Sequence, residues 1–361
     1  MTTAATLQHE SLHGWETLVL ENPYIRVRIL PEKGADLYEL IYKPRGIDVL
    51  WKTPWGLRPP TKGPTYATAS QTAWLEQYGG GWQVLFPNGG DAGEVAGTPY
   101  PFHGEAAVRP WTVESSEVEA AGVTVRLRFE GFISPTRLTR TLHLPSDERY
   151  LLITEEVTNL SPDPVALMWV QHPGFGSPFV DGATRIDTGA SRFVADDRFD
   201  GPGVPVLPGS AGAWPIMTDR DGQPFDLRRA PAWDEPRAML GYLHGFGETG
   251  WFAMTSPTHG FGVGVTWPTA IFPTAWWWQE AHATPTFPWF RRAYVVAVEP
   301  ATSAPNHGMA RLVAEGGTPL TLAGGEQRTA ELRVVFYKGT TGVAQITADG
   351  TVIRVGDEQN T

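Results

Sequence analysis

The feature that most constrains the fold of this chain is a recurrent alternation of apolar and polar residues with a period of two. In Ile25–Ile29 the aliphatic side chains fall on one face and two arginines on the other, and Val123–Phe129 repeats the pattern. Such alternation is typical of a β-strand with one buried and one wet face. No amphipathic pattern extends over three helical turns, so crossover helices are missing and the strands should pair mainly antiparallel. The sequence predicts an all-β fold, a large antiparallel β-sandwich.

Turn-forming residues separate the predicted strands. The chain holds 40 glycines and 32 prolines, which suits many short strands joined by turns such as Asn22-Pro23. The Gly/Pro-rich stretch Gly201–Trp214 is the best candidate boundary, but it is short and flanked by aromatic-bearing segments, and nothing resembles a linker. We therefore expect a single domain over residues 1–361. The remaining predicted strands are Leu37–Tyr42, Thr136–Leu144, Tyr150–Asn159, Val165–Gln171, Trp251–Thr255, Gly262–Trp267, Ala293–Glu299 and Glu331–Phe336.

Charge and composition exclude several classes of partner. The formal net charge of −11 repels phosphate backbones and anionic lipids, so we expect neither nucleic acid nor membrane as a partner. No apolar run approaches the roughly 20 residues of a membrane span, and Met1–Glu16 lacks the apolar core of a secretion signal. The absence of cysteine excludes disulfides and thiolate sites. These features favour a cytoplasmic protein, as a monomer or homodimer.

Two predicted strands end in the same way, each with a polar side chain followed by proline. The apolar run from Val165 reaches His172-Pro173, and the run from Tyr294 reaches Glu299-Pro300. Proline cannot donate to a β-ladder, so pairing is expected to stop there and leave both side chains at strand ends. An isolated case would be a polar residue turning into solvent, but two matching cases favour a function.

A glutamate and a histidine together suit the opening of a cyclic sugar. A base removes the proton of the anomeric hydroxyl while an acid protonates the ring oxygen, and the roles reverse when the ring closes on the other face. A carboxylate near its reference pKa is a competent base, and an imidazole can hold a proton near neutrality. Glu299 and His172 are therefore candidate base and acid for interconverting anomers.

Aromatic residues supply the second requirement of a sugar site, because apolar C–H faces of a pyranose pack on indole rings. The run Trp276-Trp277-Trp278-Gln279 is the main candidate among the 15 tryptophans. On a strand either Trp276 and Trp278 or Trp277 alone would face the ligand, and packing in the core explains the run about equally well. The Gln279 amide offers donors and acceptors to hydroxyls.

Several motifs, in their order along the chain, resemble the aldose 1-epimerases, also called galactose mutarotases. The resemblance covers most of the chain, and each motif is loose when taken alone. The matching segments are Asn22-Pro23-Tyr24 with Leu30–Ala35, Phe86–Gly90 with Phe102–Glu105 and Arg109–Trp111, Val157–Ser161 with Met168–Pro173, Val298–Asn306, and Leu322–Glu326 before Glu331–Tyr337.

This resemblance implies a β-supersandwich and cofactor-free mutarotation, with Glu299 as general base, His172 as general acid and His103 holding the ring-oxygen side. Asn88 and Asp91 precede His103 and offer polar contacts to the substrate. The galactose-specific members carry an arginine and an asparagine there, a pattern this chain does not clearly match, so the sugar is left open. Arg109 and Gln171 complete the expected substrate contacts.

Other classes compete with a mutarotase acting on a neutral sugar. A sugar-binding module would share the aromatic residues without needing an acid and a base. A glycosidase usually relies on two carboxylates, and a lyase on this fold would need an anionic polymer that the net charge discourages. A hexose 6-phosphate would require cations, for which Arg109, Arg291 and Arg292 are candidates. We expect no metal site, because no multi-histidine spacing stands out.

Overall fold

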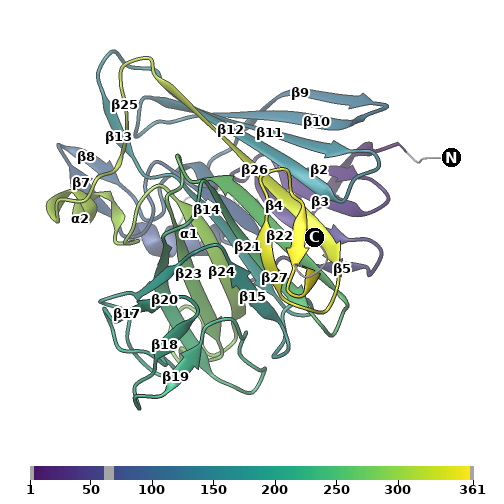
Figure 1. The fold of residues 1–361 in the computed structure, drawn as a ribbon. Helices are drawn as coiled ribbons and strands as arrows, with labels where there is room; N and C mark the ends of the chain where they lie inside the picture. Colours follow the sequence, from purple (N-terminus) through teal and green to yellow (C-terminus); the bar gives the residue numbers. More distant parts are fainter. Residues whose placement is uncertain (1–3, 61–68, 358–361) are drawn as a thin grey trace.

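Two large antiparallel sheets dominate the structure, a computed structural model that describes residues 4–60 and 69–357 (Figure 1). The larger sheet has twelve strands, in the order β1 (Thr6–Leu12), β2 (Trp15–Glu21), β3 (Ile25–Leu30), β4 (Asp36–Tyr42), β6 (Trp82–Leu85), β14 (Val170–Gly176), β24 (Tyr294–Ala301), β23 (Thr274–Ala281), β20 (Arg237–His244), β16 (Arg192–Ala195) and β17 (Ala211–Ala213), with β5 (Ile47–Asp48) beside β4. The smaller has eight, in the order β15 (Arg185–Thr188), β21 (Thr249–Ser256), β22 (Phe261–Pro268), β26 (Gln327–Lys338), β12 (Tyr150–Asn159), β11 (Thr136–Pro145), β10 (Gly122–Glu130) and β9 (Thr112–Glu119). The predicted all-β antiparallel fold is confirmed.

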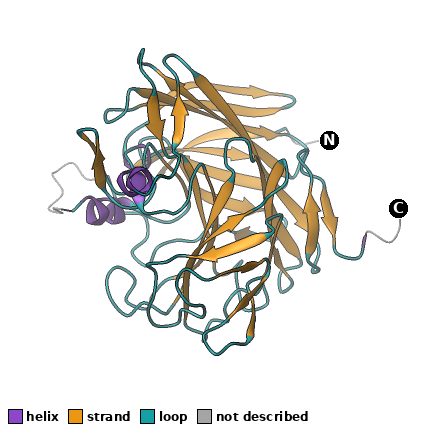
Figure 2. Cartoon of the chain, turned by 60° about the vertical axis from the view of Figure 1, so that its left-hand side comes forward, coloured by secondary structure: helices purple, strands orange, loops and turns teal. Residues whose placement is uncertain are grey.

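The remaining elements are small. Four two-stranded sheets pair β7 (Gly93–Val95) with β8 (Thr98–Tyr100), β13 (Val165–Leu167) with β25 (Leu320–Leu322), β18 (Ile216–Thr218) with β19 (Pro224–Asp226), and β27 (Val343–Ile346) with β28 (Val352–Arg354). Two short α-helices, α1 (Ser70–Gln77) and α2 (Gly308–Ala314), lie on the same side of the sheets (Figure 2). Among the described residues, no helix has the length and apolar content that crossing a membrane requires.

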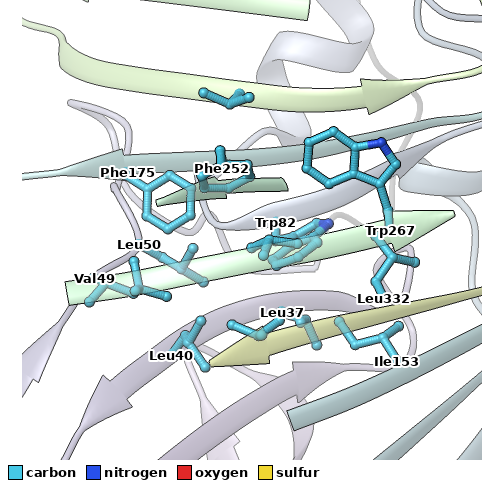
Figure 3. Close-up of a cluster of buried hydrophobic side chains, with 14 of the residues drawn as sticks. Leu37, Leu40, Val49, Leu50, Trp82, Ile153, Phe175, Phe252, Trp267 and Leu332 are labelled. Carbon is cyan, nitrogen blue, oxygen red and sulfur yellow. The ribbon is translucent and has the colours of Figure 1, made fainter. Parts of the chain in front are cut away.

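The main core fills the space between the two large sheets. In Figure 3, Leu37, Trp82 and Phe175 from the larger sheet meet Ile153, Phe252 and Leu332 from the smaller one, all of them buried. Because side chains alternate along a strand, the neighbours of these residues point to the opposite face of the larger sheet. That face carries a second apolar cluster, which includes Val170, Trp276 and Val295. The central strands of the larger sheet are therefore buried on both faces.

A buried ion pair lies in the main core next to β14. The Nε atom of Arg140 lies 2.6 Å from Oε1 of Glu155, and both side chains are fully buried. The other Glu155 oxygen accepts hydrogen bonds from Trp169 and Gln171, and a guanidinium N–H of Arg140 also reaches the carbonyl of Ala35. Such a pair is tolerated in an apolar core only because its remaining donors and acceptors are satisfied.

The strand expected over Val165–Gln171 is divided in the structure. β13 ends at Leu167, and β14 begins at Val170 and continues through Pro173 to Gly176. The expectation that pairing stops at His172 is therefore wrong, and so is the matching one for Glu299, because β24 runs through Pro300 to Ala301. Both strands lie in the middle of the larger sheet, where neighbours on either side hold them despite the missing proline N–H groups.

Candidate active site

His172 and Glu299 form a cross-strand pair between β14 and β24. The two strands pair at Val170↔Ala301 and at Gly174↔Ala297, and the residue midway on each strand is His172 or Glu299. The ladder is interrupted between these two pairs, where each strand carries a proline without an N–H. Nε2 of His172 lies 3.7 Å from Oε1 of Glu299, and both side chains are more than nine-tenths buried. The backbone thus holds an acid and a base face to face.

Burial acts on both groups in the direction that removes charge. It raises the pKa of Glu299 well above its usual value and lowers the pKa of His172 to about 4. Both shifts favour the uncharged form, a protonated carboxyl group beside a neutral imidazole. The sequence analysis assumed ordinary pKa values for Glu299 and His172, and burial shifts both of them. With both groups uncharged the pair holds one titratable proton, which can reside on either residue.

A cavity of about 390 Å³ opens above the pair, on the face of the larger sheet that points away from the main core. Trp276 and Trp278 of β23 line it beside Glu299, and Trp276 is the direct register partner of Glu299. Trp277 points the other way and is buried in the main core. The size and mixed apolar and polar lining suit a small polar ligand with apolar faces.

His103 reaches the cavity from the loop after β8. Its backbone N–H donates to the carbonyl of Gly90, and its Nδ1 accepts a hydrogen bond of 2.9 Å from the Gly90 N–H. Because Nδ1 is an acceptor, the neutral ring carries its proton on Nε2. Burial and the nearby His172 lower the pKa of His103 well below its usual value. His103 is therefore a neutral donor whose position is fixed by one glycine.

That glycine is held tightly against a second loop. Gly90 has φ +90°, and a Cβ atom added to it would lie 1.6 Å from the carbonyl oxygen of Asn306. It also forms a β-bridge with His307, so its backbone joins the loops that carry His103 and His307. Asn88 supports the same loop through hydrogen bonds to the carbonyls of Asp91 and Pro101 and from the N–H of Met309.

The helix α1 closes one wall with aromatic rings. Trp74 packs edge-on against His103 at 4.6 Å and against His172 at 5.9 Å. Tyr78, directly after the helix, lies 5.6 Å from the His172 ring, and its buried hydroxyl has no hydrogen-bond partner among the described residues. Burial and then the charges of Glu299 and Asp36 raise the pKa of Tyr78 well above its usual value. The hydroxyl is thus a proton donor without an acceptor beside the pair.

Another part of the cavity wall is formed by Asp196 and His307, which are far apart in the sequence. Asp196 accepts hydrogen bonds from the hydroxyl of Tyr242 and, at 2.7 Å, from Nε2 of His307, and its other oxygen accepts backbone N–H groups at Arg198 and Phe199. Asp196, Asp197 and His307 each offer one potential metal-ligand atom within 4.8 Å of the others. Both carboxylate oxygens of Asp196 already accept protein hydrogen bonds, so we interpret the cluster as a rigid part of the cavity wall. No local pattern in the sequence marks His307.

Four expected substrate contacts do not line the cavity. Gln171 comes directly before His172, and Gln279 comes directly after Trp278. Because side chains alternate along a strand, both glutamines point to the main-core face. Gln171 bonds there to Glu155 and Trp82. Asn88 supports a loop, as described above, and Arg109 is exposed outside the cavity. Asp91, Trp276 and Trp278 do line it, together with His103, His172 and Glu299.

Comparison with solved structures identifies the fold as galactose mutarotase-like. A proposed aldose 1-epimerase from Klebsiella pneumoniae superposes with a TM-score of 0.69 at 15% identity, covering 92% of this chain and 84% of that one. A galactose mutarotase-like protein from Clostridium acetobutylicum gives 0.63 at 17% identity, over 93% and 99%. The protein Slr1438 from Synechocystis gives 0.64 at 17% identity, over 91% and 99%. At these identities the likeness concerns the fold.

A comparison with models of protein families, based on sequence, identifies the family of this chain. Residues 12–203, more than half of the chain, match the model of a domain of unknown function, DUF4432. The chain belongs to this family. No curated protein matches it.

Proposed function

We propose that this protein is an aldose 1-epimerase that interconverts the α and β anomers of a neutral aldose. The observation that carries the proposal is the His172–Glu299 pair, 3.7 Å apart at the base of a cavity of about 390 Å³. The two oxygens that exchange protons in this reaction, the anomeric hydroxyl and the ring oxygen, are bonded to the same carbon. An acid and a base must therefore lie close together on one side of it, as these two side chains do.

The reaction uses the single proton of the pair. When a sugar enters, its hydroxyls hydrogen-bond to the carboxylate and stabilise the charged form that burial disfavours. The proton then resides on His172, and ionised Glu299 is the base. Glu299 takes the proton of the anomeric hydroxyl, C1 and O1 form a carbonyl, and the C1–ring-oxygen bond breaks. The ring oxygen keeps that electron pair and takes the proton of His172. After rotation about the C1–C2 bond, the same transfers in reverse close the ring on the other face.

Neighbouring residues position the sugar for this exchange. His103, with its proton on Nε2, donates a hydrogen bond on the ring-oxygen side. Trp276 and Trp278 offer indole surface to the C–H face of the pyranose. Because these groups are held by the sheet or by Gly90, they need little rearrangement when the sugar binds.

The charges in the cavity favour a neutral sugar over a phosphorylated one. Asp91 and Asp196 line it, and the lining cation Arg198 already lies 3.2 Å from Asp91. Arg109, Arg291 and Arg292 are not among the cavity residues. A sugar phosphate would meet acidic groups with no unpaired Lys or Arg among the described cavity residues, at an unfavourable electrostatic cost.

The test uses pure single anomers of glucose, galactose, mannose, xylose and glucose 6-phosphate, with equilibration followed by NMR. We expect wild type to accelerate at least one neutral sugar and Glu299→Gln to reduce the rate by about 10²- to 10⁴-fold, the usual contribution of a general base. Sugar binding without acceleration would instead indicate a binding module. Release of a smaller sugar from glycosides would indicate hydrolysis.

A further inference from the structure

Beside Trp278, the cavity continues into two further tryptophans, Trp289 and Trp55, that have no role in the proposed proton exchange. Trp278 and Trp289 both line the cavity, with ring centroids 5.6 Å apart. Trp55 lies 5.6 Å beyond Trp289, and the planes of these two rings differ by only 8°. A centroid separation of this size between parallel rings is an offset stack, in which each ring extends the surface of the other. We call Trp278, Trp289 and Trp55 the aromatic platform.

The platform is held in place from below. The indole N–H of Trp55 donates to the carbonyl of Tyr78 at 2.8 Å, so the outermost ring is tied to a residue of the cavity wall. Trp51 is buried beneath, edge-on to Trp278 at 6.1 Å and to Trp289 at 5.7 Å. All three platform residues are nevertheless partly exposed. A fixed apolar surface open to solvent is a common basis for binding a sugar ring.

The platform also has unused hydrogen-bonding capacity. Within residues 4–60 and 69–357, the indole N–H groups of Trp278 and Trp289 donate to no protein acceptor. Five buried tryptophans, Trp82, Trp111, Trp169, Trp267 and Trp276, do have protein acceptors, whereas the buried indole N–H groups of Trp74 and Trp277 have none among the described residues. Two free donors beside apolar ring faces match the alternating hydroxyls and C–H faces of a pyranose.

The volume of the cavity exceeds what one sugar needs. A hexose is six CH₂O units, and at roughly the 30 Å³ that a water occupies for each unit it fills about 180 Å³. The cavity is about 390 Å³, roughly twice that amount. One ring over the His172–Glu299 pair would fill about half of this volume, and Trp289 lines the same cavity.

We propose that the aromatic platform is a second sugar subsite, and that the substrate class is the reducing end of a disaccharide or short oligosaccharide. This inference rests on the proposed function, which places the reducing ring over the catalytic pair. The second ring would be joined through a hydroxyl other than the anomeric one, so that C1 stays free to open. It would stack on Trp289 and reach Trp55.

Binding to the inactive variant Glu299→Gln tests the subsite without needing turnover. Calorimetry compares matched monosaccharides and disaccharides: glucose with maltose and cellobiose, mannose with mannobiose, and galactose with galactobiose. We expect at least one disaccharide to bind about tenfold tighter than its monosaccharide, with the preference lost when Trp289→Ala is added. Trp233→Ala, which removes an exposed tryptophan outside the cavity, is the matched control and should keep the preference. Circular dichroism verifies that each variant is folded.

The two proposals fail separately in this design. Equal affinity for every matched pair, or a preference that survives Trp289→Ala, would overturn the second subsite even if wild type equilibrates monosaccharides. A disaccharide preference that depends on Trp289, in a protein whose wild type accelerates no anomer, would support the subsite and overturn the epimerase.

Discussion

His172 on β14 lies directly opposite Glu299 on β24, and a proline follows each of them in the sequence. The two strands are antiparallel, so Pro173 and Pro300 lie on opposite sides of the pair along the strands. Each proline removes an N–H donor from the same short stretch of the β14–β24 ladder, and pairing is interrupted there. The register is the same before and after the interruption. The repeated His-Pro and Glu-Pro pattern is therefore one feature of a strand pair, seen twice in the sequence.

The pKa of His172 sets the acid limit of the proposed activity. The working pair holds one proton, and below the His172 pKa of about 4 it holds two, so that no base remains. We expect kcat/KM to fall as the pH drops through about 4. An alkaline decline is expected well above pH 4.5, when Glu299 of the free enzyme loses its proton. NMR rates corrected for spontaneous mutarotation give the profile, and an acid limb near the ordinary histidine value of about 6.5 would contradict the burial effect.

Glu299 should make the folded state less stable as the pH rises. Its pKa is raised by burial above the unfolded value, so its favourable contribution is complete below about pH 4.5 and is lost as the pH rises towards the folded pKa. Glu299→Gln does not titrate, and its stability advantage over wild type should therefore grow above pH 4.5, by up to about 1.4 kcal/mol per pH unit. Urea unfolding between pH 4.5 and pH 8 measures this difference. A difference that does not change with pH would mean that folded Glu299 ionises normally.

Gly90→Ala should damage the site much more than a comparable glycine substitution elsewhere. Gly97 has a similar φ of +81°, but a Cβ atom there meets nothing within 4 Å, whereas at Gly90 it would collide with the carbonyl of Asn306. We expect Gly97→Ala to cost about 1 kcal/mol from backbone strain, and Gly90→Ala about 2 kcal/mol more from the collision. Equal losses in urea unfolding would show that the Asn306 loop can move aside freely.

Removing the Glu155 carboxylate should destabilise the core strongly. Glu155→Ala leaves the fully buried Arg140 without its counter-charge, which typically costs about 3 to 5 kcal/mol. Glu315→Ala breaks the more exposed ion pair with Arg311 and should cost less than about 1 kcal/mol. Chemical denaturation of both variants gives the comparison, and similar small losses would indicate that water or other residues compensate Arg140.

The fold could be predicted because alternation is a local property of each strand. The same rule could have excluded Gln171 and Gln279, since a residue adjacent to His172 or Trp278 on a strand must face the other side. The prediction that the strands end at His172 and Glu299 was wrong. A proline in the sequence indicates a missing N–H donor, but it does not show whether neighbouring strands hold the segment in the sheet. Asp196, Tyr242 and His307 meet through tertiary packing across long stretches of sequence, and no local pattern could have joined them.

The base of the cavity is the sheet itself, and its rim is made of loops and the helix α1. The separation of the proposed acid and base is consequently set by the spacing of two hydrogen-bonded strands, while the loops determine what can enter. Under the proposed function, insertions and substitutions in those loops would change the choice of sugar and leave the acid–base pair in place. Related chains should differ most in the loops at the cavity rim and least at the His172–Glu299 pair.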